Sequence, residues 1–285
     1  MITYEIEQPY PWLYRIKDPL DVYFSLIVGD EKALLFDTGH GVGDIKKTIR
    51  TITDKPVTVV LGHCHVDHVN GAYQFGEAYL CESEFPICRL HTKAWLREKM
   101  ILNELENRGL VLGFEKEAWC SGGEINLKAL TAGTVFALGN LHAEVVDMKG
   151  HTAGTVGLLI KEKRVLLESD GANGHCWMFL EESLSIREYI ATLERVLAME
   201  FDTFFTSHTT EAHPKAQMER FLRVAKNITM EKSTPYDVSI ELFKTLSPYI
   251  YTETFVSAET NTSNEINASA ENSVSVVFSE RTLSG

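Results

Sequence analysis

The sequence predicts an α/β fold that is rich in strands. Three short apolar runs, at residues 22–28, 33–36 and 57–61, have the length and composition of strands buried in a sheet. Residues 45–52 lie between the second and third runs and are typical of a helix. Because strands alternate with a helix over this short distance, the first part of the chain favours a β-rich α/β architecture.

The rest of the chain continues the same alternation. Ser185 and Glu188 fit the capping box that opens a helix, and the apolar residues that follow them make one stripe. A second helix opens near Pro214. Strand-like runs occupy residues 134–137, 143–148, 156–160, 165–167, 203–205 and 274–278.

Two segments stand apart from this pattern. We expect residues 1–230 to form one domain, with a helical insertion at 82–130, and residues 231–285 to be a C-terminal extension. The extension contains a stretch rich in Ser, Thr, Asn and Glu at 257–273, which is typical of a mobile tail. The insertion is either a possible lid over a binding site or a helical pair packed on the surface. The lid would use its aromatic and basic side chains, namely Arg89, Trp95, Arg97, Arg108, Phe114 and Trp119.

Composition argues against several classes of protein. The chain has 285 residues and a net charge of −13, which repels phosphate backbones, so we expect no nucleic-acid partner. No apolar stretch is long enough for a membrane span, and the N-terminus lacks the features of a signal peptide. The five cysteines form no CxxC pair and are expected to be reduced thiols. We therefore expect a cytoplasmic protein with a small-molecule substrate, and the sequence leaves a homo-oligomer open.

One short run concentrates the residue types that bind metals. His63, His65, Asp67 and His68 follow directly after the buried strand at 57–61. Alternate residues of an extended stretch point the same way, so the first three can converge on one side. Imidazole and carboxylate are ligand types that suit zinc, and also iron or manganese. The run therefore predicts a metal site.

Three residues from later in the chain share a positional feature. His151, Asp170 and His208 each come after a predicted strand. Loops beyond the carboxyl ends of strands are where α/β sheets place their ligands, and strands aligned in one core bring such loops to a common edge. We expect the three side chains to join the run at 63–68. The remaining histidines, at positions 40, 91, 142, 175 and 213, are assigned to packing or to the surface by default.

The order of these motifs resembles that of the metallo-β-lactamase-fold superfamily. The resemblance rests on the run H-x-H-x-D-H, on the segments Gly150-His151-Thr152-Ala153-Gly154, Ser169-Asp170-Gly171 and Ser207-His208 that follow it, and on Phe36-Asp37-Thr38-Gly39 before it. It implies a four-layer αβ/βα sandwich, with metals at the shared edge of the two sheets.

The resemblance also implies a ligand set. One metal would be held by His63, His65 and His151 and a second by Asp67, His68 and His208, with Asp170 bridging. Seven ligand side chains are too many for one tetrahedral ion, but they suit two ions about 3.5–4 Å apart that share a hydroxide. The expected cofactors are two divalent ions, zinc first and iron or manganese as alternatives. The hydroxide would attack an acyl or phosphoryl centre, with Asp67 or Asp170 relaying a proton.

Other residues near these motifs receive predicted roles. Asp37 ends a strand at the same rim, where it either orients a histidine ligand or stabilises the turn beside Gly39. Asn173, His175 and Trp177 follow Asp170 closely enough to bind substrate, although each could simply pack.

Fold alone does not choose a substrate, because this superfamily hosts many chemistries. We expect an enzyme, a hydrolase of a small thioester, ester or lactone, as in glyoxalase II and the N-acyl homoserine lactonases. Asp170 argues against true metallo-β-lactamases, and His65 argues against flavodiiron reductases. Three alternatives stay open: a phosphoester hydrolase, a non-catalytic descendant, and a persulfide dioxygenase with one iron. In the dioxygenase, His68 and His208 would not be ligands.

Overall fold

The computed structural model describes residues 3–110, 116–238, 243, 245–255 and 273–285. Most of the predicted low-complexity stretch, residues 257–272, lies outside these ranges, as does Phe114. None of the helices within them has the length and hydropathy of a transmembrane span.

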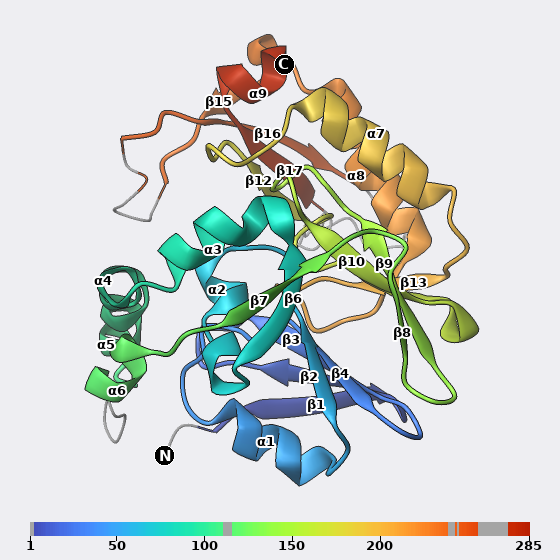
Figure 1. Cartoon of the computed structure of the whole chain (residues 1–285). Coiled ribbons are helices and arrows are strands. Elements are labelled where there is room, and N and C mark those ends of the chain that lie inside the picture. Colours follow the sequence, from blue (N-terminus) through green and yellow to red (C-terminus); the bar gives the residue numbers. More distant parts are fainter. Residues whose placement is uncertain (1–2, 111–115, 239–242, 244, 256–272) are drawn as a thin grey trace, which may run out of the picture.

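Seven strands form the first sheet, in the order β1-β2-β3-β4-β5-β6-β7. The strands are β1 (Glu5–Tyr10), β2 (Leu13–Lys17), β3 (Tyr23–Val28), β4 (Ala33–Phe36), β5 (Val57–Val60), β6 (Glu77–Cys81) and β7 (Asn126–Leu130). Neighbours from β1 to β4 pair antiparallel, and those from β4 to β7 pair parallel. Helix α1 (Ile45–Ile52) connects β4 to β5 and lies on the outer face of this sheet (Figure 1).

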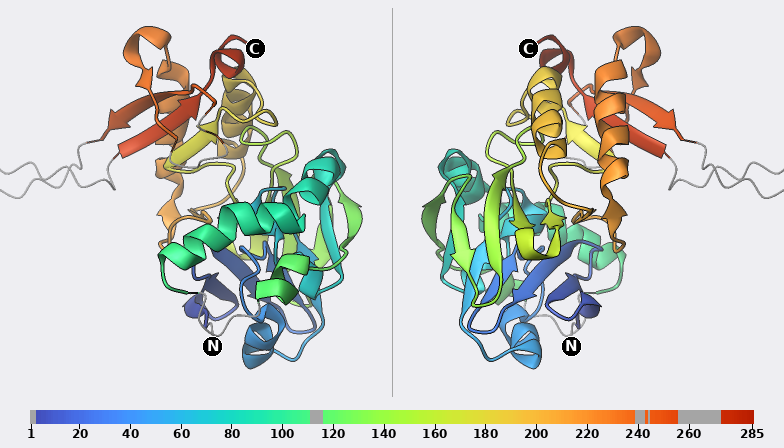
Figure 2. Two further views of the ribbon diagram at one scale, coloured as in Figure 1. Left: turned by 90° about the vertical axis from the view of Figure 1, so that its left-hand side faces the viewer. Right: turned by 90° about the vertical axis from the view of Figure 1, so that its right-hand side faces the viewer.

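Six strands form the second sheet, in the order β14-β13-β11-β10-β9-β8. They are β8 (Val135–Ala137), β9 (His142–Asp147), β10 (Val156–Ile160), β11 (Val165–Leu167), β13 (Thr203–Phe205) and β14 (His213–Pro214). Helices α7 (Ile186–Leu197) and α8 (Lys215–Asn227) lie side by side on its outer face (Figure 2, yellow and orange). The predicted capping box of α7 is confirmed, since Ser185 and Glu188 bond each other's backbone N–H groups.

Alternate residues of the central strands face different cores. In β4, Leu34 and Phe36 join the core between the two sheets, whereas Leu35 packs on the side of α1. In β11, Leu167 faces the same central core, and Leu166 packs under α7 and α8. The layers therefore run helix, sheet, sheet, helix. This confirms the predicted α/β class and its αβ/βα sandwich.

A smaller third sheet connects the C-terminal residues to the rest of the chain. Its order is β12-β17-β16-β15, and its strands are β12 (His175–Met178), β15 (Thr234–Pro235), β16 (Tyr249–Thr254) and β17 (Ser273–Phe278), followed by helix α9 (Glu280–Ser284). β17 runs parallel to β12, so the C-terminal segment is hydrogen-bonded to a strand that precedes residue 230. The domain boundary at that residue stays a prediction.

The predicted insertion is helical in its first part and a strand at its end. Its helices are η2 (Glu82–Glu84), α3 (Phe85–His91), α4 (Ala94–Leu96), the π-helix η3 (Arg97–Leu102), α5 (Asn103–Asn107) and α6 (Lys116–Ser121). Helices α4, α5 and α6 gather at the left of Figure 1. Residues 126–130, which the sequence assigned to the insertion, instead form β7 and extend the first sheet.

Candidate metal centre

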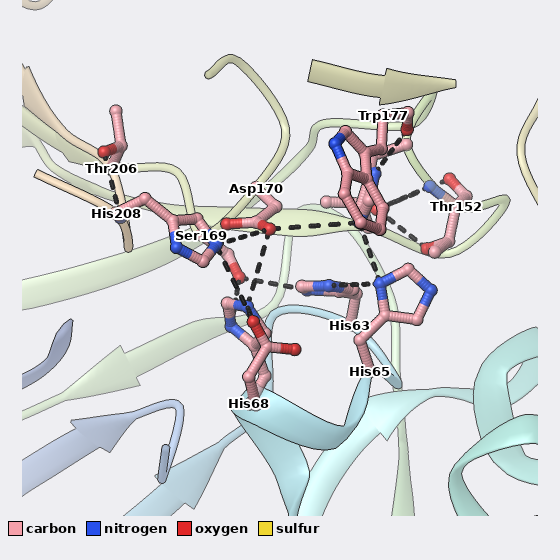
Figure 3. Close-up of polar contacts among 12 residues, drawn as sticks. His63, His65, His68, Thr152, Ser169, Asp170, Trp177, Thr206 and His208 are labelled. Atoms are coloured by element: carbon pink, nitrogen blue, oxygen red, sulfur yellow. Dashed lines mark hydrogen bonds and ion pairs between the residues drawn. The ribbon is translucent and has the colours of Figure 1, made fainter. Parts of the chain in front are cut away.

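The predicted ligands meet at one edge of the two central sheets. The run 63–68 follows β5 and ends in the short helix α2 (Val66–Val69), and His151 follows β9. Asp170 and His208 follow β11 and β13, which are parallel neighbours and therefore end together. Because strand ends at one edge are close in space, side chains far apart in the sequence come into contact (Figure 3).

Three histidines form a first ligand group. The donor atoms of His63, His65 and His151 all lie within 4.8 Å of one another. His65 Nδ1 is 2.8 Å from His151 Nε2 and 3.1 Å from His63 Nε2. All three residues are buried. The group therefore presents three imidazole nitrogens to one point inside the protein.

Two aspartates and two histidines form a second ligand group. The donor atoms of Asp67, His68, Asp170 and His208 also lie within 4.8 Å of one another. Asp170 Oδ2 is 3.0 Å from His208 Nε2 and 3.6 Å from His68 Nε2 (Figure 3). The same oxygen is 3.9 Å from His151 Nε2 of the first group. Asp170 therefore joins the two groups.

Acceptors outside the first group determine where its ring protons lie. His65 Nε2–H donates to Glu182 Oε1 at 2.8 Å, and His151 Nδ1–H donates to the carbonyl oxygen of Trp177 at 2.6 Å. His63 Nδ1 lies 3.1 Å from Ser169 Oγ. Each acceptor fixes the tautomer of its histidine, so the opposite nitrogen faces the centre with a lone pair.

The carboxylate of Asp37 organises the base of the site. It accepts hydrogen bonds from His68 Nδ1 at 2.9 Å and from Ser169 Oγ at 2.7 Å. Its other oxygen accepts the backbone N–H of Gly62 at 2.6 Å. Asp37 and Ser169 both have positive φ, of 63° and 54°, a conformation that costs a non-glycine residue energy and persists only where the surroundings enforce it. Asp37 thus contacts a histidine of the second group, and it also stabilises the turn through Gly62.

The donor atoms that face the centre of the site would repel one another unless a cation lay between them. The lone pairs of His65 and His151 point at each other across 2.8 Å with the ring protons held on the far sides, which is repulsive unless a positive ion lies between them. Among the described residues, His68 Nε2 and Asp170 Oδ1 are buried without a hydrogen-bond partner. Imidazole and carboxylate donors are those of divalent transition metals. The residues present therefore fit a metal centre.

The charge states of the first group and of Asp170 suit metal binding, whereas the nearby carboxylates raise the pKa of His68 and of His208, so these two rings would release a proton when a metal binds. Burial, reinforced by the neighbouring histidines, lowers the pKa of His63 well below its usual value, and burial lowers the pKa of His151 to about 4. Both rings are neutral at pH 7, as metal ligands must be. Burial alone would raise the pKa of Asp170, but the charges of His208 and His68 hold that pKa well below its usual range. The Asp170 carboxylate is accordingly ionised.

Comparison with known proteins supports the predicted resemblance. A family model described as "Metallo-beta-lactamase superfamily" matches residues 18–83, which include the run 63–68. The solved structure of a metallo-beta-lactamase from Pontibacter korlensis covers 79% of this chain and 100% of its own, with a TM-score of 0.54 and 17% sequence identity. The chain has the metallo-β-lactamase fold, and its residues 18–83 match the model of that superfamily.

Two curated relatives carry names of hydrolases. "Acyl-coenzyme A thioesterase MBLAC2" of Bos taurus is 24% identical over 240 residues, which are 78% of this chain and 84% of that protein. "Probable metallo-hydrolase YqgX" of Bacillus subtilis (strain 168) is 23% identical over 166 residues, 56% of this chain and 70% of that protein. Both names agree with the class of enzyme that the sequence predicts, a metal-dependent hydrolase.

The three residues predicted to bind substrate follow Asp170 in the sequence, and each has different surroundings. Asn173 is buried. His175 is exposed and is held between Ser275 Oγ, 2.7 Å from Nδ1, and the Tyr236 hydroxyl, 3.2 Å from Nε2. Trp177 is half-buried; its carbonyl contacts His151, and its ring packs on Phe179. Substrate binding by these three residues stays a prediction.

Sequence analysis missed two residues of the site. Ser169 contacts both His63 and Asp37, and its position next to Asp170 was the only signal for it. Glu182 contacts His65 from the loop between β12 and α7, and it stands in a Glu-Glu pair that looks like solvated surface. Nothing in its local sequence distinguishes it from the exposed Glu181.

The insertion residues considered for a lid are not alike. Trp95 is 51% exposed, whereas Trp119 is buried with Leu20 and Val66 in a cluster between the insertion and the sandwich. Arg108 forms exposed ion pairs with Glu104 and Asp21. Arg97 is fully buried, so it does not present its charge to an anionic substrate as the lid hypothesis supposed. A lid formed by the rest of the insertion stays a prediction.

Proposed function

We propose that this chain is a binuclear metal-dependent hydrolase that cleaves a small thioester, ester or lactone. The observation that supports the proposal most strongly is that two ligand groups converge within the same rim and share Asp170. In a single-iron centre, as in the persulfide dioxygenases, His68 and His208 would not be ligands. Such a centre would give no reason for these two histidines to converge with Asp67 and Asp170.

In this proposal the three histidines of the first group would hold the first ion. Asp67, His68 and His208 would hold the second, and Asp170, which lies near both groups, would be a ligand they share. The mixture of imidazole and carboxylate favours zinc, with iron or manganese as alternatives. When bound, such ions would lower the pKa of a metal-bound water to about 7 and would polarise the substrate carbonyl.

The chain's own groups supply orientation and proton transfer. Glu182, the Trp177 carbonyl and Asp37 hold their histidines in fixed tautomers, so the ligand nitrogens need little reorganisation. The carboxylates of Asp67 and Asp170 would lie beside a water held at this centre. They are the candidates to accept a proton from that water and to return it to the departing thiolate or alkoxide.

A thioester is the first substrate to test. The bovine relative is named an acyl-coenzyme A thioesterase, and a net charge of −13 argues against a nucleic-acid substrate. The sequence identity of 24% leaves the acyl group and the thiol open. A cytoplasmic location belongs to the same proposal.

The test combines metal analysis with a substrate panel. We expect close to two transition-metal ions per purified chain and turnover of acyl thioesters, with lactones and phosphodiesters as the comparison substrates. Turnover of phosphodiesters, without turnover of thioesters or lactones, would show that the substrate is a phosphoester and not a thioester, ester or lactone. One iron per chain, with oxygen consumed on addition of a persulfide, would overturn the hydrolase proposal.

A further inference from the structure

A buried arginine links the insertion to the loop that carries part of the second ligand group. Arg97, in η3, is fully buried. Its Nε donates to Asn70 Oδ1 at 2.8 Å, and its Nη2 donates to the Asn70 backbone carbonyl at 3.2 Å. Its Nη1 donates to the carbonyl of Trp119, also at 2.8 Å. One guanidinium thus joins α6 of the insertion to the residue that ends α2.

Asn70 transmits this contact to the ligands. Because Arg97 occupies Oδ1, the amide orientation of Asn70 is fixed and its Nδ2 faces the other way. That nitrogen donates to the carbonyl oxygen of Val66 at 2.7 Å. Val66 and Asn70 flank the turn of helix that carries Asp67 and His68, so their bond closes that turn on itself. A turn this short has little stability of its own and depends on such tertiary contacts.

The surroundings of Arg97 are specific for a guanidinium. Its flat group lies 4.7 Å from the ring centroid of Tyr73. Gly122 approaches so closely, at a φ of +56°, that a Cβ there would lie 2.0 Å from Arg97 Nη1. Within the described part of the chain, all the oxygens that Arg97 contacts are neutral. Burying a positive charge among neutral groups is unfavourable for general stability, so a different role accounts better for this residue.

The first ligand group has contacts of its own, besides the two backbone hydrogen bonds by which the carbonyl of His65 caps α2. Buried Glu84 accepts the backbone N–H of Cys64 at 3.1 Å and that of Gly154 at 2.7 Å. These two residues belong to the loops that carry His63, His65 and His151. Neither contact involves Arg97 or Asn70. A change at Arg97 should therefore act on one group and spare the other.

We propose that Arg97 is a positioning residue for the second ligand group, through which the insertion sets how tightly that group binds its metal. This inference rests on the proposed function, because it assumes that the second group holds an ion. It assigns the insertion a role beyond covering the site: Arg97 and Asn70 hold Asp67 and His68 in register with Asp170 and His208.

The test measures both sites separately in the full-length protein. Zinc would be removed from the loaded protein with a graded chelator, and cobalt would be added back to give each site a visible spectrum. Arg97→Lys keeps the charge but loses the planar fork, so we expect about tenfold weaker binding of one ion and unchanged binding of the other, since loss of an outer partner typically costs 10–100-fold. Arg108→Lys, on the exposed side of the same insertion, should leave both ions unchanged.

Gly122→Ala provides a second variant that retains every ligand and the arginine itself. The added methyl must displace the guanidinium, so the same single ion should weaken. Equal weakening of both ions, or no change in either variant, would overturn the inference. If the unchanged protein binds fewer than two ions, the proposed function fails and this inference falls with it. That failure appears in the unchanged protein and is thereby distinct from a failure confined to the variants.

Discussion

The two ligand groups differ in how they are built. The first consists of three buried, neutral imidazoles, and each is held by an acceptor from a different part of the chain. The second combines two carboxylates with two histidines, and the side chain of its His208 is 39% exposed. Two of its ligands come from one helical turn that the insertion supports. The first group is thus fixed by acceptors from three loops, whereas the turn that carries Asp67 and His68 is held by Asp37 and Thr38 on one side and by Asn70 on the other.

The largest effect is expected where the groups meet. Asp170→Ala removes the side chain that lies near both groups, so both ions should bind more weakly. Loss of a residue that only hydrogen-bonds to a ligand typically costs 10–100-fold. Because Asp170 would be a ligand itself, kcat/KM should fall by more than about 100-fold. Metal content and thioester turnover of the purified variant measure this. Asp202→Ala, an exposed aspartate paired with Arg164, is the control and should be neutral. Loss of only one ion would mean that Asp170 does not bridge.

Removal of the Glu182 carboxylate should weaken metal binding by the first group and leave the second group unchanged. Burial would raise the pKa of Glu182, but the hydrogen bond from His65 lowers that pKa to about 2, so Glu182 is ionised at neutral pH. Without this carboxylate, His65 loses its fixed tautomer. Glu182→Ala should weaken the first ion about 10–100-fold and spare the second. Glu182→Gln keeps an acceptor oxygen for His65, so it should weaken binding of the first ion less than Glu182→Ala does.

The same chelator titration distinguishes these variants, with Glu181→Gln as the matched neighbour. An effect on the second ion alone would contradict the separation of the two groups.

Glu84→Gln tests the backbone contacts of the first group. Both oxygens of Glu84 accept backbone N–H groups, so an amide must turn its NH₂ toward one of them. A buried donor left without an acceptor costs about 1–3 kcal/mol. We expect a lower free energy of unfolding by that amount, measured in urea on the metal-free protein. Glu82→Gln, on the exposed side of the same turn, should leave the value unchanged; equal stability of both variants would refute the role.

The smallest effect on metal binding is expected at Trp177. Only its backbone carbonyl contacts His151, so Trp177→Phe should keep both ions bound. If the ring binds substrate, KM should change severalfold across a series of acyl groups while metal content stays constant. Trp95→Phe, in the insertion, is the control. Identical kinetics in the unchanged protein, Trp177→Phe and Trp95→Phe would show that the Trp177 ring packs without binding substrate.

Much of the fold was predictable because its signals are local. The apolar run at 33–36 is β4 and residues 45–52 are α1, as expected, since both are short elements with clear ends. β7 was missed because Asn126–Leu130 is mostly exposed, and an edge strand shows a weak apolar pattern. Asp37 was expected at the rim because it directly follows a strand.

The sequence by itself determined the donor atoms. The spacing of His63, His65 and Asp67, and the place of His151, Asp170 and His208 after strands, predicted one site because strand ends share an edge. Only the tertiary structure decided what holds those donors in place. Glu182 and Arg97 look like ordinary charged residues in the sequence. Their roles arise because loops from distant segments pack against the ligand loops, and no local pattern records such contacts.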